Sequence, residues 1–444
     1  MTDATDNRSG LERFLGLFTE VRAGEAATVL MLALNVFLIL AAYYIVKPVR
    51  EALILAVPHG AEIKSYASAA QALILLAAVP LYAWIAGRYP RRQLINGVTI
   101  FFAAVLVLFY VMVAAGAPIA IVFFLWIGIF NLMVPAQFWA FANDLYTPES
   151  GERLFVIVAF GASAGAVFGS YIAGHLISLL GINQLILVSA ATLISSLVLT
   201  NIIDRRERLN DSGNAGSAPE EPLGKSGAFE LLLKRRYLLL IAFLIFILNW
   251  VNTTGEYILG RTVREAAIAA SVGTAAAESA VEDFIGAFYA DFFTVVNFAG
   301  LVLQLFFVSR ILKYLGVRTA MFVLPLIALG GYIVAAVVPV LSMIRSVKIA
   351  ENSTDYSLQN TVRHILFLPV TREEKYKAKQ AIDTFFQRGG DVMSALTVFV
   401  GTALLALGTR EFALINIVLV LAWIVIAWMI AREYQRLVDG SKPD

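Results

Sequence analysis

Cysteine is absent from this chain of 444 residues, histidine occurs only three times, and charged residues make up only 15%. Without cysteine there can be no disulfide bond and no thiolate metal site. The three histidines, His59, His175 and His364, are far apart in the sequence, so we expect neither a metal site nor a cofactor. A soluble domain usually carries about 25% charged residues, so this composition argues against a soluble protein.

Hydrophobic residues make up 59% of the chain, and the mean hydropathy is +0.78. These values predict an all-α integral membrane protein. The first 25 residues contain acids and no apolar core, so they resemble neither a secretory signal nor a transit peptide. We expect the lipid bilayer as a partner and no nucleic acid, and we expect a monomer.

Apolar runs long enough to cross a bilayer, about 20 residues each, predict twelve membrane-spanning helices. Their predicted ranges are 26–56, 64–86, 93–115, 118–143, 154–180, 183–203, 237–260, 284–310, 319–339, 341–366, 379–408 and 411–431. The segment 341–366 is too polar to be recognised by hydropathy. It is included because the basic loop at 371–379 would otherwise fall on the outer side, so it must line a wet cavity.

Most lysines and arginines of the predicted loops lie on one side of this arrangement, which places both termini in the cytoplasm. A segment rich in Gly, Ser, Pro and charge divides the chain into two groups of six helices. The predicted parts are a cytoplasmic N-terminal segment 1–25, a six-helix bundle 26–203, a cytoplasmic linker 204–236, a second six-helix bundle 237–431 and a cytoplasmic tail 432–444.

The two halves share a sequence pattern. Asn35, Tyr43, Lys47 and "VREA" at 49–52 recur at a constant offset as Asn249, Tyr257, Arg261 and "VREA" at 263–266. Two parallel six-helix repeats joined by a long cytoplasmic loop indicate the major-facilitator fold, with a substrate site near the membrane midplane.

Charges inside the predicted spans indicate a transport path, because such residues are costly in a membrane. The basic ones lie on the first, tenth and eleventh spans, and they are Lys47, Arg50, Arg345, Lys348 and Arg388. On the tenth span, Arg345, Lys348, Asn352, Asp355 and Gln359 follow helical spacing and form one polar stripe. Arg and Lys in this pattern suit a polyanion.

Acids and one further arginine accompany these basic residues, and we assign them gating or charge-partner roles. They are Glu51, Asp144, Glu256, Arg261, Glu351, Asp355 and Asp391. In the alternative interpretation the charges only lock helices together, and the pairs Arg50–Glu51, Lys348–Asp355 and Arg388–Asp391 could each be internal.

"GASAG" at 161–165 matches a nucleophile pattern, but it lies inside an apolar helix, where Gly161, Gly165 and Gly169 form a face for close helix packing. The Ala-rich segment 266–283 is predicted as an external amphipathic insert. No nucleophile–base or metal constellation is present, so we do not expect an enzyme.

Four stretches together resemble one known family, the nucleotide transporters of the ATP:ADP antiporter type. They are "YYIVKPVREALIL", "FWAFANDLYTPESGERLF", "RSVKIAENSTDYSLQNTVRHILFLP" and "KAKQAIDTFFQRGGDVMSA". The variants with "ENSTDYS" look like free-living bacterial relatives. Pro48 departs from the parasite-type members, which lack the "KP" step, and it could kink the first helix.

The resemblance implies a carrier in a bacterial inner membrane that exchanges nucleotides by alternating access. The basic residues above would then bind the phosphates. Base or other polar contacts would come from Asn35, Tyr43, Asn143, Asn352 and Tyr356. An empty cationic cavity closes with difficulty in a low dielectric, which favours exchange over net flux. Two alternatives remain: a transporter of another organic anion or a proton-coupled exporter, and a membrane scaffold without transport.

Overall fold

The computed structural model describes residues 19, 21–22, 24–86, 88–146, 148–210, 232–273, 277–371, 374 and 379–439. Most of the predicted N-terminal segment 1–25, the middle of the predicted linker 204–236 and the end of the predicted tail 432–444 lie outside these residues.

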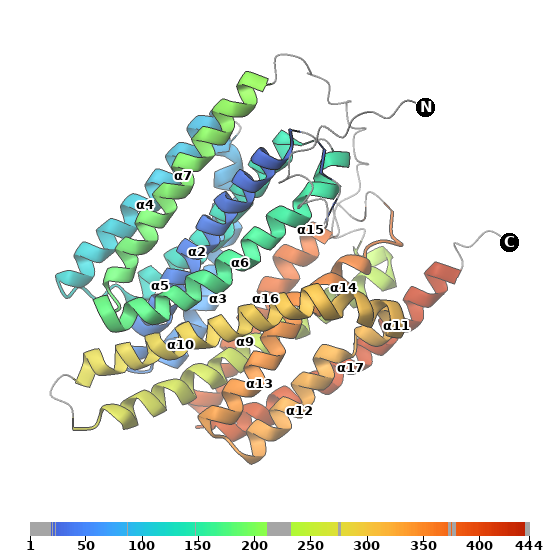
Figure 1. The fold of residues 1–444 in the computed structure, drawn as a ribbon. Coiled ribbons are helices and arrows are strands. Elements are labelled where there is room, and N and C mark those ends of the chain that lie inside the picture. The colour runs from blue at the N-terminus through green and yellow to red at the C-terminus, as the bar shows by residue number, and fades with distance from the viewer. Residues whose placement is uncertain are drawn as a thin grey trace. The chain divides into compact units, whose positions relative to one another are not determined.

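All regular elements of the described residues are helical (Figure 1). The first group of helices is α2 (Ala26–Ala56), α3 (Gly60–Ala86), α4 (Arg91–Ala114), α5 (Ala120–Leu145), α6 (Pro148–Leu180) and α7 (Gln184–Asn210). After the linker come α9 (Arg236–Ser271), α10 (Ala277–Val302), the π-helical turn η1 (Leu303–Phe307), α11 (Val308–Ala320) and α12 (Val323–Val337). The chain then continues through α13 (Leu341–Thr354), η2 (Asp355–Gln359), α14 (Asn360–Ile365), α15 (Lys379–Ala381), η4 (Ile382–Phe386), α16 (Gln387–Phe399), η5 (Val400–Leu404) and α17 (Thr409–Asp439).

The structure reproduces the predicted helix at 26–56 and extends others. α2 has the predicted bounds and continues across Pro48 as one element. The polar segment 341–366 is helical, as α13, η2 and α14. Parts of the predicted insert 266–283 are helical, because α9 continues to Ser271 and α10 begins at Ala277, and its role as an external insert stays a prediction. Residues 274–276 lie outside the described part of the chain. The apolar run that predicted the span 237–260 ends before α9 does.

One glycine sets a chain reversal that hydropathy alone could not locate. Gly316 lies inside α11 with φ +73°, a left-handed conformation that interrupts the helix. The predicted spans 284–310 and 319–339 are separated at this point. Glycine is suited to this position because it has no Cβ to oppose a positive φ.

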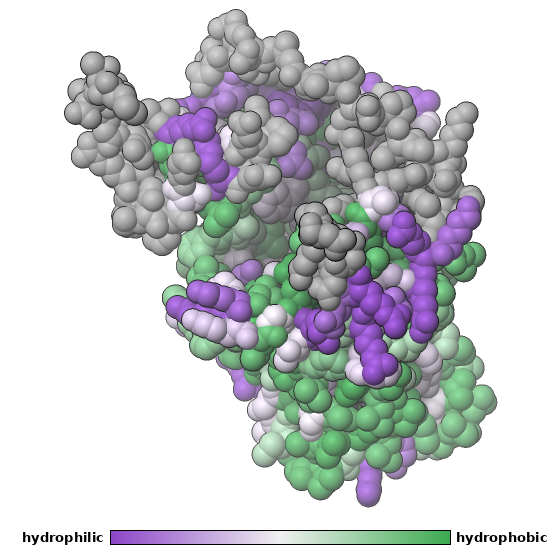
Figure 2. Space-filling view, turned by 90° about the vertical axis from the view of Figure 1, so that its right-hand side faces the viewer, coloured by the Kyte–Doolittle hydropathy of each residue, from purple (hydrophilic) through white to green (hydrophobic). Residues whose placement is uncertain are grey.

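Among the described residues, eight helices are long and apolar enough to cross a membrane. Large apolar side chains are exposed on several of them, such as Phe101 (55%), Leu179 (77%) and Val418 (67%). Figure 2 shows hydrophobic side chains over much of one face of the molecule. Such apolar surface is expected where lipid replaces water, and helices suit this setting because they pair their own backbone groups.

The chain divides into two compact units. The first comprises Met1–Glu51, Ala78–Ser217 and Tyr289–Thr294. The second comprises Ala52–Ala77, Ala218–Phe288 and Val295–Asp444. The proposed division into bundles at 26–203 and 237–431 stays a prediction, since residues 52–77 group with the second unit and 289–294 with the first.

In the first unit, α6 lies against α2 with no side chain between the two backbones. A Cβ added at Gly161, Gly165 or Gly169 would lie 2.4, 2.3 or 2.6 Å from a backbone oxygen of α2. The predicted glycine face is therefore confirmed. α4 and α7 also lie side by side (Figure 1), joined by hydrogen bonds between Asn96 and Asn201 of 2.9 and 3.2 Å.

In the second unit, α9 packs against α13, α16 and α17. Gly390 on α16 approaches α9 so closely that an added Cβ would lie 2.6 Å from the carbonyl oxygen of Phe246. Trp250 of α9 donates a 2.9 Å hydrogen bond to Thr397 of α16. These contacts hold α9 in a fixed orientation, with its polar residues facing α13.

Candidate functional site

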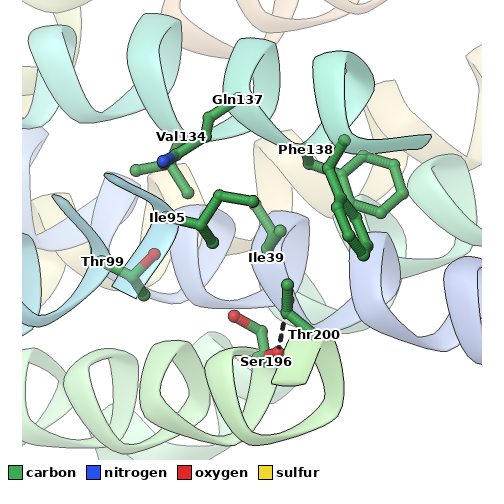
Figure 3. A pocket seen from close by; sticks show the side chains of 9 residues that line it. Ile39, Ile95, Thr99, Val134, Gln137, Phe138, Ser196 and Thr200 are labelled. Atoms are coloured by element: carbon green, nitrogen blue, oxygen red, sulfur yellow. Dashed lines mark hydrogen bonds between the residues drawn. The ribbon is translucent and has the colours of Figure 1, made fainter. Parts of the chain in front are cut away.

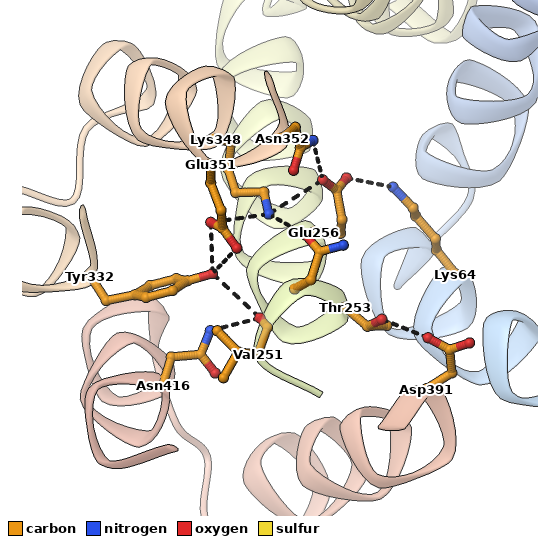
Figure 4. A network of polar contacts seen from close by, with 11 residues as sticks. Lys64, Val251, Thr253, Glu256, Tyr332, Lys348, Glu351, Asn352, Asp391 and Asn416 are labelled. Atoms are coloured by element: carbon orange, nitrogen blue, oxygen red, sulfur yellow. Dashed lines mark hydrogen bonds and ion pairs between the residues drawn. The ribbon is translucent and has the colours of Figure 1, made fainter. Parts of the chain in front are cut away.

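A polar cluster inside the second unit is built around Lys348 of α13 (Figure 4). Only 1% of this side chain is exposed. Its Nζ donates a 2.8 Å hydrogen bond to Oδ1 of Asn252, and it lies 3.3 Å from the Glu351 carboxylate and 3.5 Å from that of Glu256. Asn252 and Glu256 are four residues apart on α9, and Lys348 and Glu351 are three apart on α13. Helical spacing therefore brings all four side chains together.

Tyr332 of α12 ties Glu351 to the backbone of α9. Its hydroxyl lies 3.1 Å from one oxygen of Glu351 and 3.3 Å from the carbonyl oxygen of Val251. Asn416 of α17 donates a 3.1 Å hydrogen bond to the same carbonyl. Gly255 makes room for this arrangement, because a Cβ there would lie 2.1 Å from the Tyr332 hydroxyl. Four helices thus support one buried ion pair.

Glu256 links Lys348 to a second lysine, Lys64 of α3. The Nζ of Lys64 lies 3.9 Å from one carboxylate oxygen of Glu256, and the other oxygen accepts a 3.1 Å hydrogen bond from Asn352. The Glu256 side chain is 24% exposed. The two lysines and the carboxylates of Glu256 and Glu351 balance each other, so the cluster is formally neutral.

The predicted pair Lys348–Asp355 is wrong. Lys348 pairs with Glu351, one turn away, and with Glu256 of α9. The polar stripe expected on 345–359 divides at the π-helical turn η2, which begins at Asp355. Lys348 and Asn352, which precede that turn, enter the cluster, whereas Asp355 and Gln359 line a separate pocket. A π-helical turn changes the helical period, which spacing rules for an α-helix do not anticipate.

The predicted pair Arg388–Asp391 is confirmed on α16, with 3.3 Å between Nη1 and the carboxylate. Asp391 also accepts a 2.7 Å hydrogen bond from Thr253 of α9. Arg388 keeps 27% of its side chain exposed, so it is less enclosed than Lys348. Arg345 on α13 is half-buried.

In the first unit, Lys47 is enclosed by aromatic rings and is 7% exposed. Its Nζ lies 3.8 Å from the ring centroid of Phe293, 4.9 Å from that of Tyr44 and 5.7 Å from that of Tyr43. Aromatic faces attract a cation, and this stabilisation grows when water is excluded. Tyr43 therefore contributes to the environment of Lys47.

The predicted pair Arg50–Glu51 is also confirmed, as a direct contact between the two side chains. The guanidinium of Arg50 lies over the ring of Phe124 at 4.6 Å. Glu51 is 1% exposed, whereas Arg50 is half-buried. The arginine is thus the more accessible member of the pair.

Asn35, predicted as a substrate contact, joins two helices in this structure. Its Nδ2 donates to Thr200 of α7 at 2.6 Å and to the carbonyl of Ser196 at 3.1 Å, and the residue is fully buried. Ser196 and Thr200 line a small pocket with Gln137 (Figure 3). The structure gives Asn35 a packing role, and its contact with a substrate stays a prediction.

Four further predicted residues lie away from the cluster. Asn143 is exposed near the end of α5, and Asp144 pairs with Arg91 at 3.4 Å. Arg261 on α9 pairs with Glu265 at 3.0 Å and donates a 3.0 Å hydrogen bond to the carbonyl of Leu407. Tyr356 is 45% exposed beside the pocket that contains Asp355.

Several members of these clusters were not predicted from the sequence. They are Lys64, Asn252, Tyr332 and Asn416 in the second unit, and Tyr44 and Phe293 around Lys47. Lys64 is the first residue of the predicted span 64–86, and nothing in the sequence connected it with Glu256. Asn252 could have been predicted from the sequence, because it lies four residues before Glu256 and so shares its helix face.

Comparison with known proteins places the chain in a family. The model of the Major Facilitator Superfamily matches residues 32–365, and the model described as TLC ATP/ADP transporter matches residues 305–435. Two relatives, both called ADP,ATP carrier protein 5, are 23% identical in Rickettsia bellii and 22% in Rickettsia conorii. Each alignment covers 70% of this chain and 68% of the relative.

Solved structures share the fold. A bacterial homologue of the human lysosomal transporter Spinster matches with a TM-score of 0.63 at 14% identity, covering 94% of this chain and 99% of the other. The nucleoside transporter NupG matches with a TM-score of 0.63 at 10% identity, covering 91% and 98%. The family model covers well over half of the sequence, so this chain belongs to the major facilitator superfamily of membrane transporters.

Proposed function

We propose that this transporter exchanges nucleotides, ATP for ADP or a related NTP for NDP, by alternating access. One observation carries the proposal: the ATP/ADP transporter model matches residues 305–435, which include Lys348, Glu351 and Arg388. The ion pairs of the candidate site therefore lie in the part of the chain that is similar to nucleotide carriers. The similarity to the two rickettsial ADP,ATP carriers supports the same assignment.

The geometry of Lys348 supports binding of a polyanion. Its amine already contacts three oxygen acceptors, from Asn252, Glu256 and Glu351. A phosphate group can replace a carboxylate at such an amine, because both offer anionic oxygens to the same donors. Arg388 is more exposed, and a bidentate contact from its guanidinium to phosphate would compete with Asp391.

The same pairs support exchange, but for another reason than the uncompensated cationic cavity expected from the sequence, because this cluster is formally neutral. When the substrate leaves, Glu351 and Glu256 are positioned to pair again with Lys348, so the lysine is not left uncompensated in a low dielectric. The paired cluster links α9, α12, α13 and α17, and an incoming polyphosphate has to break it. Occupancy is thereby coupled to the packing of these helices, which favours movement of the loaded carrier over the empty one.

The test is transport by the purified protein in liposomes. We expect uptake of labelled ATP to be fast when the vesicles contain ADP and slow when they contain buffer alone. Lys348→Gln should abolish uptake, whereas Lys313→Gln, a matched change at an exposed lysine of α11, should leave it unchanged. ATP uptake that does not depend on internal nucleotide would contradict exchange.

A panel of competing anions decides among the alternatives. If another organic anion drives uptake and no nucleotide competes, the protein transports that anion. If uptake follows an imposed pH gradient without internal nucleotide, it is proton-coupled. A scaffold without transport predicts that the wild type takes up no anion of the panel.

A further inference from the structure

A pocket of about 370 Å³ in the second unit lies apart from the Lys348 cluster, among α9, η2, α14 and α16. Its wall includes the carboxylate of Asp355 and the carboxamides of Asn249 and Asn360. A cavity of roughly 10–15 Å³ already holds one water molecule, so this pocket has room for an ion together with several waters. Part of the wall is the π-helical turn η2, a feature frequent at functional sites.

Asp355 is the charged group of this wall that has no counter-ion among the described residues. Glu351, Asp383 and Asp391 each contact a lysine or an arginine, whereas no described residue forms an ion pair with Asp355 or donates a hydrogen bond to its carboxylate. The residue is only partly buried, and both carboxylate oxygens keep accessible surface. A carboxylate inside a membrane protein is costly unless a cation or a donor compensates it. This carboxylate, exposed to the pocket, is suited to a cationic ligand.

The π-helical turn η2 brings a second oxygen ligand to the same face. The backbone N–H of Asn360 donates to the carbonyl oxygen of Asp355, the bond that defines a π-helical turn. Residues five apart therefore lie one above the other here, whereas in an α-helix, at 3.6 residues per turn, they would point about 140° apart. The turn thus places the carboxamide of Asn360 and the carboxylate of Asp355 on one face, toward the pocket that both line.

Asn249 of α9 contributes a third oxygen. Its Nδ2 donates a 2.8 Å hydrogen bond to the carbonyl of Ile245, so its Oδ1 is the atom left for a ligand. No described residue donates to Oδ1 of Asn249 or of Asn360. Carboxylate and carboxamide oxygens are the ligands that hard cations take in proteins. A metal ion can contact all three groups at once, whereas a proton on Asp355 would satisfy only one of them.

The charges around the pocket indicate the valence of the ion. Arg363 also lines the pocket, but its guanidinium contacts Asp383, so these two charges cancel. Lys348 is likewise paired, with Glu351. Asp355 therefore gives the pocket one net negative charge. A monovalent cation neutralises this charge, whereas a divalent cation would leave one uncompensated positive charge in the interior.

We propose that this pocket binds an alkali-metal cation, Na⁺ or K⁺, through the carboxylate of Asp355 and the carboxamide oxygens of Asn249 and Asn360, with water completing the coordination. The proposal goes beyond nucleotide exchange and does not depend on it. Because η2 directly continues α13, which carries Lys348, the ion would bind next to the helix of the candidate site.

Thermal unfolding of the purified full-length protein in detergent tests this, with NaCl, KCl, MgCl₂ or choline chloride at equal ionic strength. We expect NaCl or KCl to raise the melting temperature above that in choline chloride, because methyl groups shield the charge of choline from oxygen ligands. At ten times the dissociation constant, the cation should raise the folding equilibrium constant about tenfold.

Asp355→Asn should abolish this rise. In choline chloride the variant should melt no lower than the wild type, because it no longer carries an uncompensated carboxylate. Asp283→Asn, a matched change at an exposed aspartate of α10, should keep the full rise in NaCl or KCl.

A second variant keeps the test decisive if Asp355→Asn does not fold. Asn360 is exposed at the start of α14, so Asn360→Leu leaves the core intact, and it should raise the NaCl or KCl concentration needed for half of the effect about tenfold. Equal melting of the wild type in NaCl, KCl and choline chloride overturns the proposal. So does a rise that Asp355→Asn or Asn360→Leu leaves unchanged. A rise that requires Asp355 but occurs only in MgCl₂ overturns the assignment to a monovalent ion.

Discussion

Lys348 and Glu351 form an ion pair across 3.3 Å in which the lysine side chain is 1% exposed and the glutamate side chain 4%. A buried pair of this kind gives little net stability, but removing one partner costs about 3–5 kcal/mol because the other charge remains buried. The pair is therefore sensitive to any anion that replaces the carboxylate. This sensitivity suits a site that must respond to its substrate.

Lys348→Gln should lower the free energy of unfolding by about 3–5 kcal/mol, because Glu351 and Glu256 then lose their buried cation. Glu351→Gln should also destabilise the protein. The double variant should lose clearly less than the sum of the two, since residues in contact are coupled. Thermal unfolding of the wild type, the two single variants and the double variant in detergent measures the coupling between the two charges. Strictly additive losses would show that the two charges do not interact.

Gly255→Ala should destabilise the protein by about 1–3 kcal/mol, because its Cβ would lie 2.1 Å from the Tyr332 hydroxyl. Tyr332→Phe removes that oxygen and should recover part of the loss in the double variant. Gly330→Ala on α12 is the matched control, since no atom lies within 4 Å of its added Cβ. Melting temperatures of these variants provide the measurement. Equal melting of the two alanine variants would argue against this packing.

Gly165→Ala should weaken the packing of α6 on α2 by about 1–3 kcal/mol, because the new Cβ would lie 2.3 Å from the carbonyl oxygen of Phe37. Gly97→Ala on α4 meets no atom within 4 Å, and it should be neutral or slightly stabilising because alanine favours helix. Unfolding curves of the two variants make the comparison. A loss of similar size in Gly97→Ala would point to a general effect of replacing glycine.

The carboxyl group of Glu25, just before α2, makes the stability of the folded protein depend on pH. Burial alone would raise its pKa, but hydrogen bonds from the Arg153 guanidinium and the Arg22 backbone amide outweigh burial and hold the pKa below its ordinary value of 4.5. A lowered pKa in the folded state stabilises the protein above pH 4.5, and this is lost as the pH falls through the lowered value. We expect the ionised Glu25 to add about 1 kcal/mol to the free energy of unfolding, because the side chains of Glu25 and Arg153 are both partly exposed.

The comparison of wild type with Glu25→Gln at several pH values measures this effect. At neutral pH the wild type should unfold at the higher temperature. The difference should shrink steadily once the pH falls below 4.5. A difference that stays constant down to strongly acid pH would show that the carboxylate does not carry the effect.

Sequence alone could predict what depends on local pattern. Apolar length located α2 from Ala26 to Ala56, and the spacing of Gly161, Gly165 and Gly169 predicted a close helix contact. Pairs within one or three residues, Arg50–Glu51 and Arg388–Asp391, were also predictable. In each case the interacting groups lie within one helix or depend on one helical period.

What could not be predicted depends on which helices meet. Tyr332 reaches Glu351, and Asn416 reaches Val251, from helices whose neighbours no local spacing defines. The partner of Lys348 was missed because two carboxylates on the same polar segment lie at helical spacing, and the structure selects Glu351 over Asp355. Phe293 could not be assigned to Lys47 because it lies far along the chain, on α10.

The glycine contact between α6 and α2 also constrains how the first unit can move. With backbone against backbone along α2, sliding one helix past the other would press a side chain of α6 into a space that holds none. The two helices therefore have to shift together as one rigid body. Lys47 lies on α2 beyond Ala41, the last residue of this contact, so we expect any displacement of α2 at Lys47 to displace α6 as well.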